Sequence, residues 1–302
     1  MANHIIEDIK LSFKSGNPVS RLILFNSIVF IVMGLLRIFT FLASKSGASI
    51  TLESIVFNNL ALPLNFQQFL FKPWTIITYM FTHIELFHIF WNMLSLYWFG
   101  QLLVGYTSPK KIIPLFLMGG IGGALLTMLL FTVIPAFHPF LGASLIGASA
   151  GVTAIIVAVA TLLPTVKINM FLVGSVKLIY IALFVIFIDV LNIASRSNIG
   201  GNISHLGGAL VGYFFIIQYK RGHDLSIGIN RFFTFSSTFF SRKPKSKMKV
   251  SYKQKVSDDD YNYNKKVDQQ KIDNILDKIS KSGYESLSKA EKEFLFQASN
   301  KP

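Results

Sequence analysis

Six long apolar stretches lie between residues 22 and 219, and the connections between them are short except for the first, residues 44–82. An apolar run of about 20 residues is long enough to cross the hydrocarbon core of a bilayer as a helix. We therefore expect an all-α polytopic membrane protein, a six-transmembrane-helix bundle with a cytoplasmic tail. The helices are expected at about residues 22–43, 84–105, 112–136, 146–163, 177–194 and 203–219.

The polar segments divide the chain into four regions. Residues 1–64 hold the N-terminal segment, the first helix and the start of the first loop, and residues 65–220 form the core. Residues 221–267 are expected to be a basic, disordered linker, of which 225–240 lie on the membrane surface. Residues 268–302 regain a helical period and predict a small hairpin.

Composition supports this class and sets an orientation. Mean hydropathy is +0.51, and 52% of residues are hydrophobic. Residues 1–219 carry 11 Lys and Arg against 5 Asp and Glu, and residues 220–302 carry 18 against 10. The 106–111 and 164–177 connections are basic, whereas 137–145 has neither Lys nor Arg, so both termini are expected in the cytoplasm. The membrane is expected to be a bacterial inner membrane.

The charge also bears on partners and cofactors. Net charge +14 is explained by topology and by attraction to lipid headgroups, and no nucleic-acid recognition motif accompanies it, so nucleic acid is not an expected partner. The chain has no cysteine, which excludes disulfides and thiolate metal sites. We expect no metal and no cofactor.

Candidate chemistry converges at one depth of the predicted bundle. The helices at 84–105, 146–163 and 203–219 all enter from the outer face, and near that face they carry His88 and Asn92, Ser149, and His205. Ionisable groups within a membrane are costly and mark functional sites. A serine becomes a nucleophile when a base such as imidazole takes its proton, and Asn92, His88 and the Ser149 N–H are candidate oxyanion donors.

No carboxylate occupies the same register of these three helices, so we expect a Ser149–His205 dyad rather than a triad. Asp189 and Asn192, near the outer end of the fifth helix, either hydrate the site or pair across helices. Close packing would bring the dyad together, because small residues let helix backbones approach in lipid. We assign that packing role to Gly147 and Gly151 on the fourth helix and to Gly208 and Gly212 on the sixth.

Three motifs carry a family resemblance: His83-x4-His88-x3-Asn92-Met93, Gly147-Ala148-Ser149, and His205-x2-Gly208-x3-Gly212. In this order they resemble the rhomboid family of intramembrane serine proteases, over roughly residues 65–220. The resemblance implies that Ser149 is the nucleophile, His205 the general base, and His88 and Asn92 oxyanion stabilisers. It also implies cleavage of transmembrane protein substrates near the outer face, with lateral access near the second and fifth helices.

The tail resembles a short C-terminal module of Bacteroidetes-type rhomboids. We interpret it as an interaction module for an unidentified partner, with Ser288 and Glu291 forming a capping box.

The chain departs from the family pattern at three positions. Ala150 follows the serine where rhomboids usually have glycine, Thr75 follows Trp74 where arginine is common, and Thr153 stands where an aromatic residue often stacks on the histidine. A transporter is disfavoured because no internal repeat is evident, and a metalloprotease because the chain lacks His-Glu-x-x-His. Two functions stay open: a serine endopeptidase, or a catalytically weak rhomboid-like binder or chaperone of membrane proteins.

Overall fold

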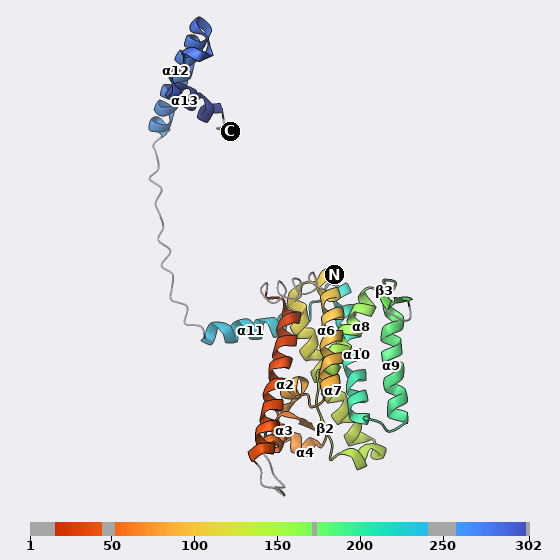
Figure 1. Cartoon of the computed structure of the whole chain (residues 1–302). Coiled ribbons are helices and arrows are strands. Elements are labelled where there is room, and N and C mark those ends of the chain that lie inside the picture. Colours follow the sequence, from red (N-terminus) through yellow and green to blue (C-terminus); the bar gives the residue numbers. More distant parts are fainter. Residues whose placement is uncertain (1–15, 44–51, 171–173, 241–257, 300–302) are drawn as a thin grey trace. The chain divides into compact units, whose positions relative to one another are not determined.

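The computed structural model describes residues 16–43, 52–170, 174–240 and 258–299. The chain separates into two compact units, residues 1–241 and 242–302. The first unit contains a bundle of helices that run side by side (Figure 1). These are α2 (Pro18–Ala43), α6 (Leu86–Tyr106), α7 (Ile112–Val133), α8 (Ser149–Leu162), α9 (Leu178–Ala194) and α10 (Ile199–Lys220).

Helix α8 is the centre of this bundle. Every residue from Ala150 to Ala160 is buried, as expected of a helix that is apolar on all sides. It packs mainly against α7 and α10. At its C-terminal end, the Lys220 ammonium donates a hydrogen bond of 2.7 Å to the carbonyl of Thr161, which satisfies an orphan carbonyl and complements the helix dipole.

The outer helices expose large apolar side chains. Leu35 of α2 is 62% exposed and Phe184 of α9 is 63% exposed. Such a surface is unfavourable in water but suits contact with lipid. Within the described residues, three helices are long and apolar enough to cross a membrane, Pro18–Ala43, Pro109–Val133 and Ile199–Lys220, while α8 and α9 are apolar but shorter. The protein is therefore an integral membrane protein, and the count of six spans stays a prediction.

The connection between α2 and α6 is built from short elements. They are α3 (Leu52–Leu60), β1 (Leu62–Pro63), α4 (Phe66–Phe71), α5 (Thr75–Thr78) and η1 (Tyr79–Phe81). Strand β1 pairs antiparallel with β2 (Ser144–Leu145), with Leu62 opposite Leu145. The Trp74 indole N–H donates to the carbonyl of Asn59 at 2.8 Å, and the Thr75 hydroxyl donates to the carbonyl of Lys72 at 2.6 Å. This loop thereby holds the segment that precedes Ser149.

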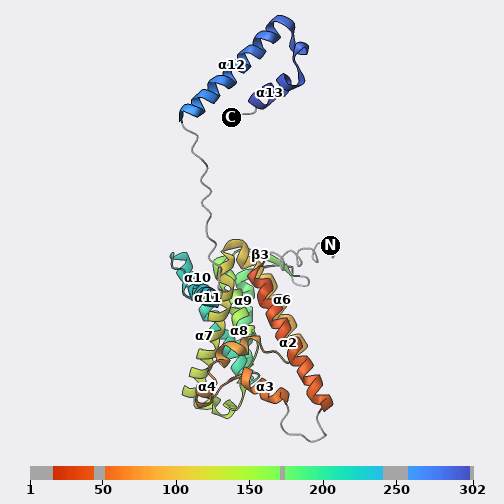
Figure 2. The ribbon, with the colours of Figure 1, turned by 90° about the vertical axis from the view of Figure 1, so that its left-hand side faces the viewer.

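The bundle has two chemically different ends (Figures 1 and 2). Elements α3, α4 and β2 lie at one end, and α11 (Ser226–Phe240) and β3 (Lys167–Met170) lie at the other. Strand β3 pairs antiparallel with β4 (Gly174–Lys177) and places Lys167 opposite Lys177. The segment η3 (Pro135–Phe140) follows α7, and residues 137–145 there contain neither Lys nor Arg. The basic connections thus lie at the end opposite β2.

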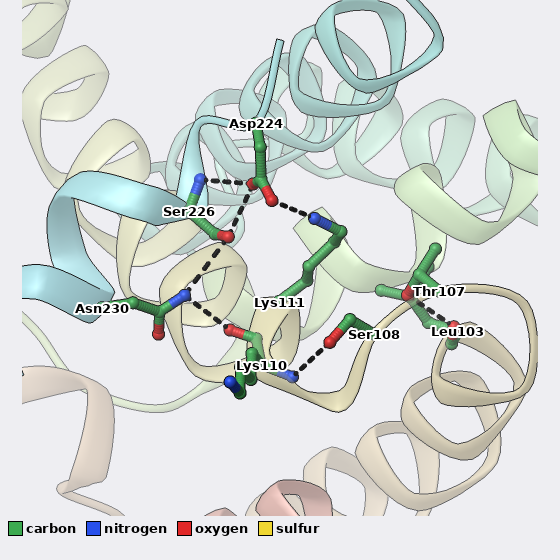
Figure 3. A network of polar contacts seen from close by, with 8 residues as sticks. All are labelled: Leu103, Thr107, Ser108, Lys110, Lys111, Asp224, Ser226 and Asn230. Carbon is green, nitrogen blue, oxygen red and sulfur yellow. Dashed lines mark hydrogen bonds and ion pairs between the residues drawn. The ribbon is translucent and has the colours of Figure 1, made fainter. Parts of the chain in front are cut away.

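A polar network fastens α11 to the start of α7 (Figure 3). The buried Lys111, at the end of η2 (Pro109–Lys111), forms an ion pair with Asp224. Asp224 also accepts hydrogen bonds from the N–H of Ser226 at 2.9 Å and from its hydroxyl at 2.6 Å. Asn230 donates to the carbonyl of Lys110 at 3.1 Å. Desolvation alone would raise the pKa of Asp224, but the bonds from Lys111 and Ser226 outweigh it and lower the pKa.

The structure differs from the disordered linker predicted for residues 221–267. Residues 226–240 are helical and α11 packs on α7, and residues 258–267 begin the next helix, so the expectation of disorder over 221–267 was wrong at both ends. The apolar period of residues 225–240 was sufficient for an amphipathic helix. Residues 241–257, the middle of that segment, lie outside the described residues.

The second unit is a helical hairpin. Helix α12 (Asp258–Ser282) ends before Gly283, whose φ of +80° breaks the helix, and η4 (Tyr284–Ser286) leads to α13 (Lys289–Ser299). The expected capping box is present: the Ser288 N–H donates to the Glu291 carboxylate at 2.7 Å, and the Glu291 N–H donates to the Ser288 hydroxyl at 3.4 Å. Lys278 joins the two helices by pairing with Glu291 at 3.0 Å.

Candidate active site

A cavity of about 860 Å³ lies between α6, α8, α9 and α10, toward the end of the bundle that carries β2. The four side chains predicted from the sequence, His88, Asn92, Ser149 and His205, all line it. They come from three helices separated in the chain by long connections. The structure therefore brings the predicted residues together in one site.

Ser149 is the first residue of α8. A helix of 14 residues is roughly 21 Å long, which is shorter than the roughly 30 Å of bilayer hydrocarbon. If α8 ends at the basic face, Ser149 therefore lies below the opposite membrane surface. The first N–H groups of a helix lack intrahelical acceptors and lie at its positive end, so the start of α8 offers donors to a negatively charged oxygen.

The turn before Ser149 depends on glycine. Gly147 has φ of +109°, a region that residues with a side chain rarely adopt. A Cβ atom at Gly147 would lie 2.6 Å from Cε1 of His88. The Gly147 N–H donates to the carbonyl of Tyr79 at 2.8 Å. Gly147 thus shapes the turn and makes room for His88, so its predicted role in helix packing was wrong: it precedes α8.

His83 supports the same turn. Its buried imidazole accepts a hydrogen bond from the Ala148 N–H at 3.2 Å. The rings of His83 and His88 meet edge to face, with centroids 5.1 Å apart. His83 therefore holds the backbone one residue ahead of Ser149 and stands behind His88, which faces the cavity.

His205 has a carboxylate partner. Its Nδ1 atom lies 2.8 Å from Oδ1 of Asp189 on α9, and the Asp189 side chain is only 6% exposed. The expected dyad was argued from carboxylates on three helices only, and this carboxylate comes from a fourth. Of the two alternatives left open for Asp189, pairing across helices is the one found.

The contact with Asp189 leaves Nε2 of His205 for a second interaction. Among the hydrogen bonds of the described residues, none joins Ser149 to His205. Catalytic hydrogen bonds are often long in ligand-free sites and shorten when substrate binds. Ser149 and His205 line the same cavity, so a substrate bound there could contact both side chains.

His88 and Asn92 lie one turn apart on α6. The Asn92 side-chain amide donates to the carbonyl of His88 at 2.8 Å, and Asn92 is 7% exposed. An asparagine amide has two N–H groups, so the second remains for a ligand. The half-buried His88 lies against Gly147. Both side chains therefore line the same cavity as Ser149 at the start of α8.

The other predicted packing glycines lie where helix backbones meet. A Cβ atom at Gly212 would lie 2.9 Å from the carbonyl carbon of Ala154, and one at Gly151 would lie 2.7 Å from the carbonyl oxygen of Phe116. Gly208 contacts the backbone of Ala150 in the same way. These positions allow the close approach that small residues give to helices in lipid.

Comparison with known proteins agrees with this geometry. The family model described as Rhomboid domain matches residues 70–221, which is half of the chain. The chain belongs to the rhomboid family. A curated rhomboid relative is the RHOMBOID-like protein 12, mitochondrial, of Arabidopsis thaliana, 30% identical over 158 residues. The match covers 49% of this rhomboid and 47% of that relative, so the chain spans about half the length of the relative.

The tail of this rhomboid matches a second model. Residues 256–301 match a family of unknown function (DUF6576), and these residues include both helices of the hairpin.

In the described part of the chain, no group of three or more His, Asp or Glu side chains is placed to hold a metal ion.

Asp189 is the site residue whose role sequence reasoning missed. It is the one charged residue in the apolar segment 178–194. Helices α9 and α10 are joined by a short turn, so the last turns of α9 meet the first turns of α10. A single carboxylate 16 residues before His205 was therefore a usable signal, since antiparallel neighbours place such residues at similar depth.

Proposed function

We propose that this rhomboid is an intramembrane serine endopeptidase that cleaves transmembrane protein substrates near the outer membrane face. The proposal rests chiefly on the shared cavity of Ser149, His205, His88 and Asn92. Membership of the rhomboid family agrees with it. Peptide-bond hydrolysis needs a nucleophile, a base and oxyanion donors, and these four residues supply all three.

The proposed steps assign one role to each of these groups. Nε2 of His205 takes the proton of the Ser149 hydroxyl as the serine oxygen attacks the scissile carbonyl carbon. The oxyanion is stabilised by the Ser149 N–H, the Asn92 amide and the His88 imidazole. His205 then gives its proton to the leaving amine, and the acyl-enzyme ester is hydrolysed by a water that His205 deprotonates. One positioned base typically contributes about 10²–10⁴-fold in rate.

Substrate access is proposed from the side, between α6 and α9. Exposed Phe87 and Trp91 of α6 and Phe184 of α9 line the same cavity and carry its apolar wall to the lipid-facing surface. A transmembrane segment can reach Ser149 there without leaving the bilayer. We further propose six spans in a bacterial inner membrane. We propose that both termini lie in the cytoplasm, because the basic connections share one end of the bundle.

Labelling with a fluorophosphonate serine probe tests the proposal. Purified wild-type protein in detergent is expected to react, while Ser149→Ala abolishes labelling and His205→Ala reduces it strongly. Ser95→Ala, which removes a hydroxyl from the same cavity, serves as the matched control and should still label. Absence of labelling in folded wild-type protein would favour the alternative, a rhomboid-like binder or chaperone with weak or no hydrolysis.

A further inference from the structure

The contact between Asp189 and His205 supports an inference that deepens the proposed protease function and rests on it. We infer that Asp189 is a positioning residue that fixes the tautomer of His205 and stabilises its protonated form. The carboxylate Oδ1 lies 2.8 Å from Nδ1, and both side chains are largely buried, at 6% and 20% exposure. The reactive group would then be a Ser149–His205–Asp189 triad.

The tautomer follows from the chemistry of the pair. An ionised carboxylate only accepts hydrogen bonds, so the Nδ1 atom that faces it carries the proton. Nε2 is then unprotonated and can accept the hydroxyl proton of Ser149. Without the carboxylate the imidazole could adopt either tautomer or rotate, and only one of those arrangements serves as a base.

The surroundings of Asp189 indicate that the contact is more than incidental. A carboxylate within an apolar helix is costly unless it is paired, and α9 is apolar around it. Among the contacts of the described residues, Oδ2 of Asp189 has no hydrogen-bond partner. His205 is therefore the group that compensates for burial of this carboxylate, and the two residues depend on each other.

Among the titratable side chains of the described residues near His205, Asp189 is the one that contacts it directly. His88 lies across the cavity on α6, and Glu85, just before α6, lines the same cavity. Helices α7 and α8 pack on α10 and carry no titratable side chain, although α8 supplies the Ser149 hydroxyl. On α9, residues 178–194, Asp189 is the one residue that is charged at neutral pH. Thr153 of α8 lines the same cavity and has no ring that could stack on His205.

A positioning role and a purely structural role make different predictions. If Asp189 only pins α9 to α10, its loss lowers stability and leaves the cleavage rate of the protein that stays folded unchanged. If it acts through His205, the folded variant without the carboxylate loses cleavage rate, because the imidazole is no longer held in the Nδ1–H tautomer.

The experiment measures cleavage of a transmembrane model substrate and fluorophosphonate labelling against pH. The variants are Asp189→Asn, Asp189→Glu and the control Asn192→Ala, which lies on the same helix outside the cavity. Asp189→Asn is expected to lower the maximal rate of the folded protein by roughly 10²–10⁴-fold, by analogy with serine protease triads. Asp189→Glu should restore part of the rate, and Asn192→Ala should match wild type.

A measurement on the wild-type protein covers the case in which Asp189→Asn does not fold. Nitrogen NMR of the imidazole, assigned by comparison with His205→Ala, should show the Nδ1–H tautomer near neutral pH. The Nε2–H tautomer in wild type, or an unchanged cleavage rate in folded Asp189→Asn, would overturn the inference. Failure of wild-type protein to label would instead reject the protease function, while the tautomer still reports on the contact.

Discussion

Gly208 of α10 lies directly against the carbonyl group of Ala150, the residue that follows the candidate nucleophile. A Cβ atom at Gly208 would stand 2.9 Å from the carbonyl carbon of Ala150. The Ala150 methyl group lies on the α7 side, where a Cβ atom at Gly123 would come within 2.8 Å of it. Alanine is therefore accommodated after Ser149 because glycines on α7 and α10 leave room for it.

Replacing Gly208 with alanine should separate α10 from α8. The added methyl group overlaps backbone rather than a flexible side chain, and such overpacking costs typically about 1–3 kcal/mol. We expect a lower thermal midpoint in detergent and reduced labelling of Ser149, because His205 lies on the same helix one turn earlier. Gly105→Ala on α6 is the control, since open space surrounds that position. Equal stability of the two variants would contradict this packing.

Gly147→Ala should impair the site more than the fold. The substitution strains a backbone with φ of +109° and places a methyl group on the His88 imidazole. Strain of this kind costs about 1–3 kcal/mol, and displacement of His88 removes a proposed oxyanion donor. We expect at least a tenfold loss of fluorophosphonate labelling. Gly142→Ala, in the same connection but with no atom within 4 Å of its added Cβ, should label at the wild-type rate.

Apolar periodicity was sufficient to predict the long helices, because a helix in lipid needs a continuous apolar run whatever its neighbours are. It also placed Ser149, His88 and His205 at one depth, since that depth depends only on distance from the helix ends. The predicted start of the fourth helix at residue 146 was three residues early. The backbone there is turned by Gly147 and held by Tyr79 and His83, and contacts from a distant loop leave no periodic signal.

Asp189 shows a second limit of the sequence. Its value lies in a contact across helices, and whether it faces His205 or lipid depends on the rotation of α9 about its axis. Apolar residues surround it on all sides of the helix, so the pattern does not set that rotation. The β3–β4 hairpin was not predicted either. Its strands pair through backbone hydrogen bonds, with Lys167 opposite Lys177, and the side-chain pattern gives no sign of that pairing.

The ion pair of Lys111 with Asp224 should stabilise the junction between α7 and α11. The Lys111 side chain is 8% exposed, and removing its partner leaves a buried charge. Hydrogen bonds to charged groups contribute about 1.5–3 kcal/mol, so Asp224→Asn is expected to lower the thermal midpoint. The control is Asp277→Asn in the tail, where the ion pair is exposed. Similar midpoints for the two variants would argue against the junction.

The same ion pair predicts a pH dependence. The pKa of Asp224 is lowered below its ordinary 3.8 in the folded protein, so the unfolded chain binds the proton more readily. The stabilisation is present in full above about pH 3.8 and is lost as pH falls through the lower, folded value. Thermal melts of wild type and Asp224→Asn should therefore differ near neutral pH and converge on acidification. A difference that does not shrink as pH falls below 3.8 would assign the effect to another group.

The capping box of the tail should respond to acid in the same direction. Hydrogen bonds from the Ser288 N–H and then from Lys278 lower the pKa of Glu291 from 4.5 to about 2. The carboxylate thus favours folded α13 above pH 4.5, and this contribution disappears as pH falls toward 2. Carboxyl NMR of the intact protein should show Glu291 titrating near pH 2, and Glu291→Gln should reduce amide protection in α13 at neutral pH. Glu293→Gln, on the same helix but outside the box, is the control, and an equal loss of protection in that variant would refute the role of Glu291.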